Sequence, residues 1–134
     1  MTDGLAALVP APYAEVVTRT REALAAQGFG VLTEIDVKAT MKTKLDADLE
    51  DYVILGACNP PLAHQALQVD RHIGVLLPCN VVVRAHGDMT VVEAVDPAGM
   101  VAMAGNESLA PVAQEATRRL QLAISAVAHP VVAA

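Results

Sequence analysis

Short apolar runs, separated by Pro, Gly, Asn and charged residues, predict most of the secondary structure of this chain. Strands are expected where apolar and β-branched residues follow one another without helical spacing. The run Tyr52–Ala57 is apolar almost throughout, which predicts burial on both faces of a sheet. The turn His86-Gly87-Asp88 is expected to join two strands into a hairpin. The predicted strands are Gly4–Val9, Phe29–Ile35, Tyr52–Ala57, Ile73–Leu77, Cys79–Ala85 and Met89–Val95.

Helices are predicted where apolar residues recur three and four positions apart. The strongest pattern runs from about Glu107 to Val127, and a first helix extends from Pro12 to a left-handed cap at Gly28. Asn59 suits an N-cap and Pro60 the first helical position. The shorter predicted helices cover Asp36–Leu45, Pro60–Val69 and the stretch from Asp96 to just before Gly105.

The order of these elements indicates the fold class. Strands and helices mix without the regular alternation of a doubly wound parallel sheet, and a hairpin with segregated helices is typical of an α+β fold. The length of 134 residues fits one domain. We therefore expect a single α+β domain over residues 1–128 with a long C-terminal helix, and a frayed tail over residues 129–134.

The composition indicates a partner. Hydrophobic residues make up 54% of the chain and the mean hydropathy is +0.41, which is high for a small protein. Aromatic residues are limited to Tyr13, Phe29 and Tyr52, so Val, Leu, Ile, Ala and Met must form the core. The apolar surplus predicts an exposed apolar surface that a partner covers, and a homodimer is the expected arrangement.

Charge and segment length exclude other classes. A net charge of −6 repels phosphate, and three aromatic rings offer few platforms for stacking bases, so we expect no nucleic-acid binding. The uncharged runs fall short of the roughly 18–20 residues of a membrane span. The N-terminus lacks the basic residues of a secretory signal. Two cysteines without such a signal predict reduced thiols and a cytoplasmic location.

The candidate site lies at two Cys-Asn pairs, each interrupting an apolar run. Cys58 ends a buried strand one residue ahead of a helix cap, where backbone N–H groups and the helix dipole can stabilise a thiolate. If the strand that begins at Cys79 lies beside the first, both thiols face one pocket. The candidate ligand-binding residues are Cys58, Asn59, Pro60, Cys79 and Asn80.

Three interpretations of this region remain open. The first is a non-enzymatic, homodimeric module that binds a small ligand or a soft metal, with Cys58, Cys79, His64 and His72 as metal candidates. The second is a thiol-dependent redox or sulfur-transfer protein with Cys58 as nucleophile and Cys79 as resolving partner. The third is two inert cysteines buried as small hydrophobic residues. The sequence contains no CxxC, hydrolase elbow or glycine-rich phosphate loop, which favours the first over an enzyme.

Four sequence blocks resemble a bacterial and archaeal family catalogued only as domain of unknown function 302. The resemblance implies a compact α+β domain with an antiparallel sheet, helices packed on one side, and members that often form dimers. It implies no activity, substrate or catalytic residue. The matching blocks are GFGVLTEIDVKATMKTKL (Gly28–Leu45), YVILGACNPPLAHQAL (Tyr52–Leu67), IGVLLPCNVVV (Ile73–Val83) and VVEAVDPAGM (Val91–Met100).

Overall fold

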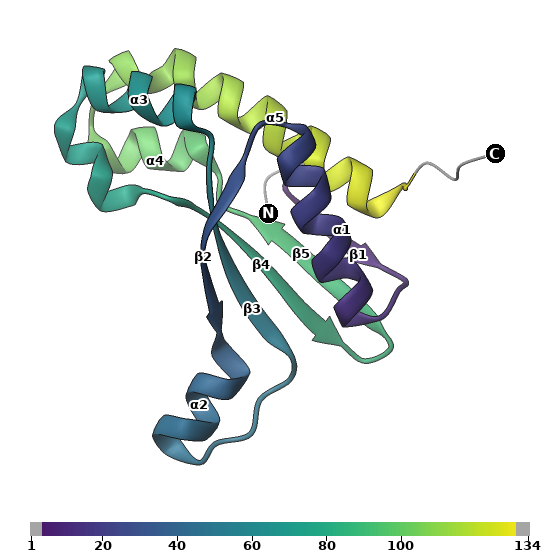
Figure 1. Cartoon of the computed structure of the whole chain (residues 1–134). Helices are drawn as coiled ribbons and strands as arrows, with labels where there is room; N and C mark the ends of the chain where they lie inside the picture. Colours follow the sequence, from purple (N-terminus) through teal and green to yellow (C-terminus); the bar gives the residue numbers. More distant parts are fainter. Residues whose placement is uncertain (1–3, 131–134) are drawn as a thin grey trace.

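A computed structural model describes residues 4–130 and shows a five-stranded antiparallel sheet with helices on one face and across one end (Figure 1). The strand order is β1-β5-β4-β3-β2, and every neighbouring pair is antiparallel. The strands are β1 (Ala6–Val9), β2 (Gly30–Asp36), β3 (Tyr52–Cys58), β4 (Cys79–His86) and β5 (Met89–Ala94). The α-helices are α1 (Tyr13–Ala26), α2 (Val37–Leu45), α3 (Pro60–Val69), α4 (Pro97–Ala104) and α5 (Ala110–Ala128). The predicted α+β class, one-sided helix packing and long C-terminal helix are confirmed.

The main core lies on one face of the sheet, which we call the inner face. Residues at alternate positions of a strand point to the same face, and the register aligns them: Val53 lies opposite Val83, and Leu55 lies opposite Val81. All four side chains are buried. Helix α1 and the second half of α5 pack on this face and complete the core. Their buried residues include Val16, Leu24, Leu120, Ala123, Ile124 and Val127.

A second group of helices lies across one end of the sheet (Figure 1). It consists of α3, the 3-10 helix η1 (Arg71–Leu76), α4 and the beginning of α5, and we call it the helical layer. Its own buried cluster contains Ala66, Ile73 and Leu109. Helix α5 therefore belongs to both parts, since its first half packs in the helical layer and its second half packs on the sheet.

Local signals in the sequence set the helix ends as predicted. The Asp36 carboxylate accepts a hydrogen bond from the Ala39 N–H at 2.9 Å and caps α2. The Asn59 side chain accepts from the Leu62 N–H at 3.3 Å and caps α3. Gly28 follows α1 with a φ of 85°, a left-handed conformation that costs glycine little. In residues 4–130 no helix combines the length and apolar character needed to cross a membrane.

The predicted strand Ile73–Leu77 is wrong, because this stretch forms η1 instead. The Asp70 carboxylate accepts a hydrogen bond from the His72 N–H at 2.9 Å, which starts the turn. Ile73 packs inward, 4% exposed, whereas Val75 is 87% exposed. An apolar run is therefore used here to cover the helical layer, and local capping with tertiary packing outweighs the strand preference of its residues. The Leu77–Pro78 peptide is cis and leads directly into β4.

The prediction that Tyr52–Ala57 is buried on both faces is also wrong. Val53, Leu55 and Ala57 are buried on the inner face, but Tyr52 and Ile54 on the other face remain half-buried. The reason is that the helices of residues 4–130 leave this second face uncovered (Figure 1). The predicted final helix begins one turn late as an α-helix, after a 3-10 turn at Glu107–Leu109. Of the predicted frayed tail, residues 131–134 lie outside the described part.

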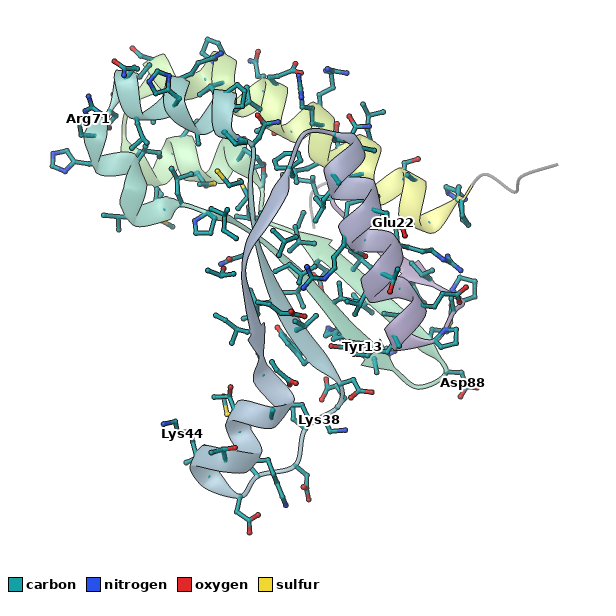
Figure 2. The ribbon with its side chains drawn as sticks, viewed as in Figure 1. Tyr13, Glu22, Lys38, Lys44, Arg71 and Asp88 are labelled. Carbon is teal, nitrogen blue, oxygen red and sulfur yellow. The ribbon has the colours of Figure 1, made fainter. Side chains whose placement is uncertain are left out.

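Helix α2 projects from the opposite end of the sheet, away from the helical layer. Lys38 and Lys44 lie on this projection, whereas Arg71 lies at the outer corner of the helical layer (Figure 2). Ion pairs hold the lysine side chains of α2, with Lys38 Nζ 3.3 Å from Asp51 Oδ1 and Lys42 Nζ 2.9 Å from Asp46 Oδ1. Such exposed pairs add little stability because solvent screens them, and the Asp36 cap is the local feature that fixes the start of α2.

Two leucines of α5 test this description of the core. Leu120 is fully buried between α5 and the sheet, and Leu122 on the same helix is 44% exposed. We expect Leu120→Ala to lower the free energy of unfolding by about 2–5 kcal/mol, because it removes buried contacts and leaves a cavity. Leu122→Ala should change it by less than about 0.5 kcal/mol. Urea unfolding followed by circular dichroism measures both, and equal losses would contradict the assigned orientation of α5.

Candidate functional site

The register of β3 and β4 brings the two cysteines together. Ala57 lies directly opposite Cys79, so Cys58 and Cys79 occupy neighbouring positions at the same end of the sheet. Strand β3 ends at Cys58 and passes through Asn59 into α3, while β4 begins at Cys79. Both cysteines are free thiols and half-buried. The predicted proximity of the two Cys-Asn pairs therefore follows from one strand pairing.

A cavity of about 340 Å³ lies between this end of the sheet and the helical layer. Its wall is hydrocarbon apart from the Asn59 amide, the two thiols and the thioether of Met100. Such a lining favours a guest that makes few hydrogen bonds. Besides these residues, the wall includes Phe29 and Ala57 near the sheet, Leu62, Ala63, Ala66 and Leu67 of α3, Ile73 of η1, Val101 of α4, and Val112, Ala113 and Ala116 of α5.

A polar clamp closes one side of this site. Asn59 is 5% exposed, and its side-chain N–H donates to the Gln27 carbonyl at 3.3 Å. Arg119 Nη1 donates to the same carbonyl at 3.1 Å. A Cβ atom on Gly28 would come within 3.1 Å of both Arg119 Nη1 and Asn59 Nδ2. The clamp thus joins the end of α1, the start of α3 and the middle of α5, and it requires a glycine at position 28.

Two arginine side chains keep the Glu115 carboxylate, which contacts Arg119 of the clamp, ionised. The guanidinium groups of Arg118 and Arg119 hydrogen-bond the Glu115 carboxylate and lower its pKa from 4.5 to about 2. Arg119 Nε lies 2.9 Å from Glu115 Oε1. The carboxylate therefore stays charged at any pH near neutrality, and it orients the guanidinium that reaches Gln27.

The surroundings of Cys79 argue against this thiol as an activated nucleophile. Burial raises the pKa of Cys79 from 9.0 to about 11, and the neighbouring Cys58 adds to the rise. A thiolate is the reactive form of cysteine, so Cys79 is a neutral thiol at physiological pH. Its chemistry in the cavity is that of a soft, polarisable wall group.

The structure separates the predicted site residues into two groups. Cys58, Asn59 and Cys79 line the cavity. Pro60 is exposed at the first position of α3, and Asn80 is exposed on the face of the sheet opposite the cavity. Neither of these two residues contributes to the cavity wall.

The two histidines considered as metal candidates are also away from the cavity. His64 is exposed on α3, where its ring Nε2 lies 3.1 Å from Gln68 Nε2. His72 is exposed in η1. Within residues 4–130 no three His, Cys, Asp or Glu side chains come together as a metal-binding group.

The sequence interpretation did not identify much of the cavity wall, because that part of the wall comes from α4 and α5, far along the chain from Cys58 and Cys79. Met100 and Val101 of α4 and Ala113 and Ala116 of α5 line it. Two features of the sequence accompany these residues. The segment Pro97–Ala104 contains no charged side chain, and the first half of α5 places the small residues Ala113 and Ala116 on its apolar stripe. A run of small side chains facing a core is one way to leave space in it.

Comparisons with known proteins agree with this architecture. A family model described as "Domain of unknown function DUF302" matches residues 6–127. The crystal structure of an uncharacterised conserved DUF302 protein from Bacillus stearothermophilus is similar, with a TM-score of 0.84 and 29% sequence identity. The match covers 90% of this chain and 94% of that one. Comparison with curated protein sequences gave no match.

The raised pKa of Cys79 predicts its reactivity. At pH 8 a thiol with a pKa of about 11 is ionised in only about one molecule per thousand. We expect iodoacetamide to modify Cys79 of the folded Cys58→Ser variant at least about a hundredfold more slowly than in denaturant, with the rate still rising above pH 9. Mass spectrometry at timed intervals measures this rate. A folded-state rate at pH 8 equal to the denatured one would contradict the buried neutral thiol.

Proposed function

Because the chain belongs to the DUF302 family, whose description assigns no activity, we propose a function from the geometry of its cavity. The protein is a non-enzymatic module that binds a small, neutral, apolar molecule between the end of its sheet and the helical layer. The observation that supports this most directly is the size and lining of the cavity, about 340 Å³ with a nearly continuous hydrocarbon wall. Small-molecule sites commonly begin at about 300 Å³ and are mostly apolar.

The volume limits the size of the ligand. An apolar protein cavity of about 150 Å³ holds one benzene molecule. By proportion, a cavity of about 340 Å³ accommodates a guest of about a dozen non-hydrogen atoms. This corresponds to a fused two-ring aromatic compound, a terpenoid fragment or a medium-length acyl chain.

The wall also limits the charge of the ligand. The residues that line the cavity carry no charged side chain, and burial of an unpaired charge costs several kcal/mol. Asn59 already uses its oxygen to accept from the Leu62 N–H and one of its two side-chain N–H groups to donate to the Gln27 carbonyl. The two thiols offer weak hydrogen bonds and polarisable contacts. These properties favour a neutral molecule, with aromatic or sulfur-containing groups best suited to the thiol side of the cavity.

A binding role fits the chemistry of the wall better than catalysis. General acid–base or nucleophilic catalysis needs a titratable group poised near neutral pH and within reach of the substrate. Cys79 has its pKa raised to about 11, and His64 and His72 lie on the exposed surface away from the cavity. Tight burial of an apolar guest, in contrast, needs only shape and hydrocarbon contact.

Thiol chemistry is the second candidate function, supported by the placement of Cys58 and Cys79 on one cavity wall. Two thiols can bind a soft monovalent metal such as Cu(I), or act as nucleophile and resolving partner in sulfur transfer. Metal coordination is favoured over redox exchange here, because a metal ion can displace the proton from a buried thiol. Either role requires reduced thiols, which accords with a cytoplasmic location.

Filling the cavity tests the proposed function. Ala116→Leu and Ala63→Leu each place a larger side chain at the wall, from α5 and α3 respectively. We expect wild-type protein to bind 1-aminonaphthalene, a neutral two-ring fluorophore, and each variant to weaken this binding about tenfold or more by occupying the guest's volume. Fluorescence titration gives the dissociation constants. Ala126→Leu, on the exposed side of α5, is the matched control and should leave binding unchanged.

The same titrations distinguish the apolar-ligand function from the thiol-based second candidate. Absence of binding by the wild-type protein to neutral aromatic, terpenoid and acyl probes of this size would refute the apolar-ligand proposal. Stoichiometric Cu(I) binding that is lost in both Cys58→Ser and Cys79→Ser would then favour the soft-metal role. Undiminished probe binding in both Ala116→Leu and Ala63→Leu would place the probe outside the cavity.

A further inference from the structure

One residue of the cavity wall is exposed to solvent, and it marks the mouth of the cavity. Leu32 lies on β2, the edge strand of the sheet (Figure 1), and it lines the cavity although it is 68% exposed. The other lining residues within 4–130 are buried or half-buried. Phe29 and Ala116, for example, are buried and form the deep part of the wall. Because a cavity opens where its lining is exposed, its mouth lies at Leu32.

A β-bulge sets the position of Leu32. Val31 pairs with Ala57 and Thr33 pairs with Gly56, so Leu32 is left without a partner in β3. An extra residue of this kind bends the strand and turns its side chain out of the regular alternation, and bulges are common beside functional sites. The bulge therefore frees Leu32 from the strand ladder at the point where the sheet meets the cavity.

The neighbouring strand holds the bulge in this register. A Cβ atom on Gly56 would collide with Thr33 Oγ1 and would come within 2.9 Å of Pro78 Cγ. Thr33 follows the bulge directly, and Pro78 is itself a lining residue of the cavity. Both side chains use the space that the glycine leaves. The bulge is therefore a packed part of the structure, and Leu32 is held at the mouth.

We infer that Leu32 contacts the outer end of the bound guest and gives the cavity a preference for guests long enough to reach its mouth. This inference rests on the proposed function, since it concerns the same cavity. A single exposed leucine is ordinary on a protein surface. Leu32 differs from such a residue because the cavity lining and the strand register single it out independently.

The physical reason is the removal of apolar surface from water. A guest that reaches the mouth covers the Leu32 side chain, and the hydrophobic contribution grows with the area that both lose to solvent. A shorter guest stays among the buried lining residues and leaves Leu32 exposed. Leu32 is thus a specificity-determining residue, since it favours long guests and has little effect on short ones.

The volume of the cavity shows which guests reach that far. An apolar cavity of about 150 Å³ holds one benzene molecule, so a ring of that size occupies only about half of the roughly 340 Å³ present here. Toluene therefore fits within the deep part. The alkyl chain of n-pentylbenzene fills most of the remaining volume and extends to the mouth. Comparing these two guests separates a contact at Leu32 from a general change in the cavity.

The first test shortens Leu32. Leu32→Ala should weaken the binding of n-pentylbenzene about tenfold and that of toluene less than about twofold, because only the longer guest loses a contact. Ile35→Ala is the matched control, since Ile35 lies on the same strand, is 48% exposed and is absent from the cavity lining. It should leave both affinities unchanged. Displacement of 1-aminonaphthalene, followed by fluorescence, gives the dissociation constants, and circular dichroism verifies that each variant is folded.

The second test places a fluorescent side chain at the mouth. The chain contains no tryptophan, so Leu32→Trp introduces a single indole whose emission reports its own surroundings. We expect n-pentylbenzene to shift this emission to shorter wavelength and to protect the indole from quenching by acrylamide, because the guest displaces water from it. Toluene should produce a much smaller change. Ile35→Trp is the control and should respond to neither guest.

Three results would overturn the inference while the proposed function stands. The first is unchanged binding of both guests in Leu32→Ala, and the second is an equal loss for both, which would indicate a structural role for Leu32. The third is an indole emission in Leu32→Trp that does not respond to saturating n-pentylbenzene. Failure of the wild-type protein to bind toluene, n-pentylbenzene and 1-aminonaphthalene is a different outcome, because it would refute the proposed function and this inference together.

Discussion

The long helix α5 packs against two different surfaces along its length, and the rest of the structure depends on this double contact. Its second half carries Leu120, Ile124 and Val127 into the main core on the sheet. Its first half presents Ala113 and Ala116 to the cavity, where small side chains leave space that larger ones would fill. Because the helix is one rigid element, the sheet, the helical layer and the cavity between them hold a fixed geometry.

Short-range rules predicted much of the fold, since its helix ends are set by residues that act locally. Asp36 and Asn59 cap their helices through hydrogen bonds to N–H groups three residues ahead, as their residue types predict. The errors arose where tertiary packing decides. The run Ile73–Leu77 has strand composition, but it closes the helical layer as a 3-10 turn capped by Asp70. The local sequence does not show that the helical layer has apolar surface against which this run packs.

The candidate site, like the fold, could be predicted from the sequence only in part. Cys58, Asn59 and Cys79 line one cavity. The sequence interpretation placed the two thiols at one pocket only if their strands were neighbours, and β3 and β4 are paired. It could not supply the walls contributed by α4 and α5, which lie far along the chain. Nor could it show that burial raises the pKa of Cys79. That shift depends on the hydrocarbon that packs around the start of β4, which the order of residues along the chain does not show.

The apolar surplus of the sequence, 54% of residues, exceeds what one core on one face of a sheet can bury, and the structure distributes the remainder over two surfaces of different shape. The cavity is concave, so a small guest can lose most of its contact with water there. The uncovered second face of the sheet, around Val82, is flat and broad, so only another broad surface can cover it. The same hydrophobic driving force acts at both places, since its strength follows the area removed from water. Shape therefore limits what each surface can bind: the cavity beside Cys58 and Cys79 has room only for a small molecule, whereas a flat apolar face needs a partner as broad as itself.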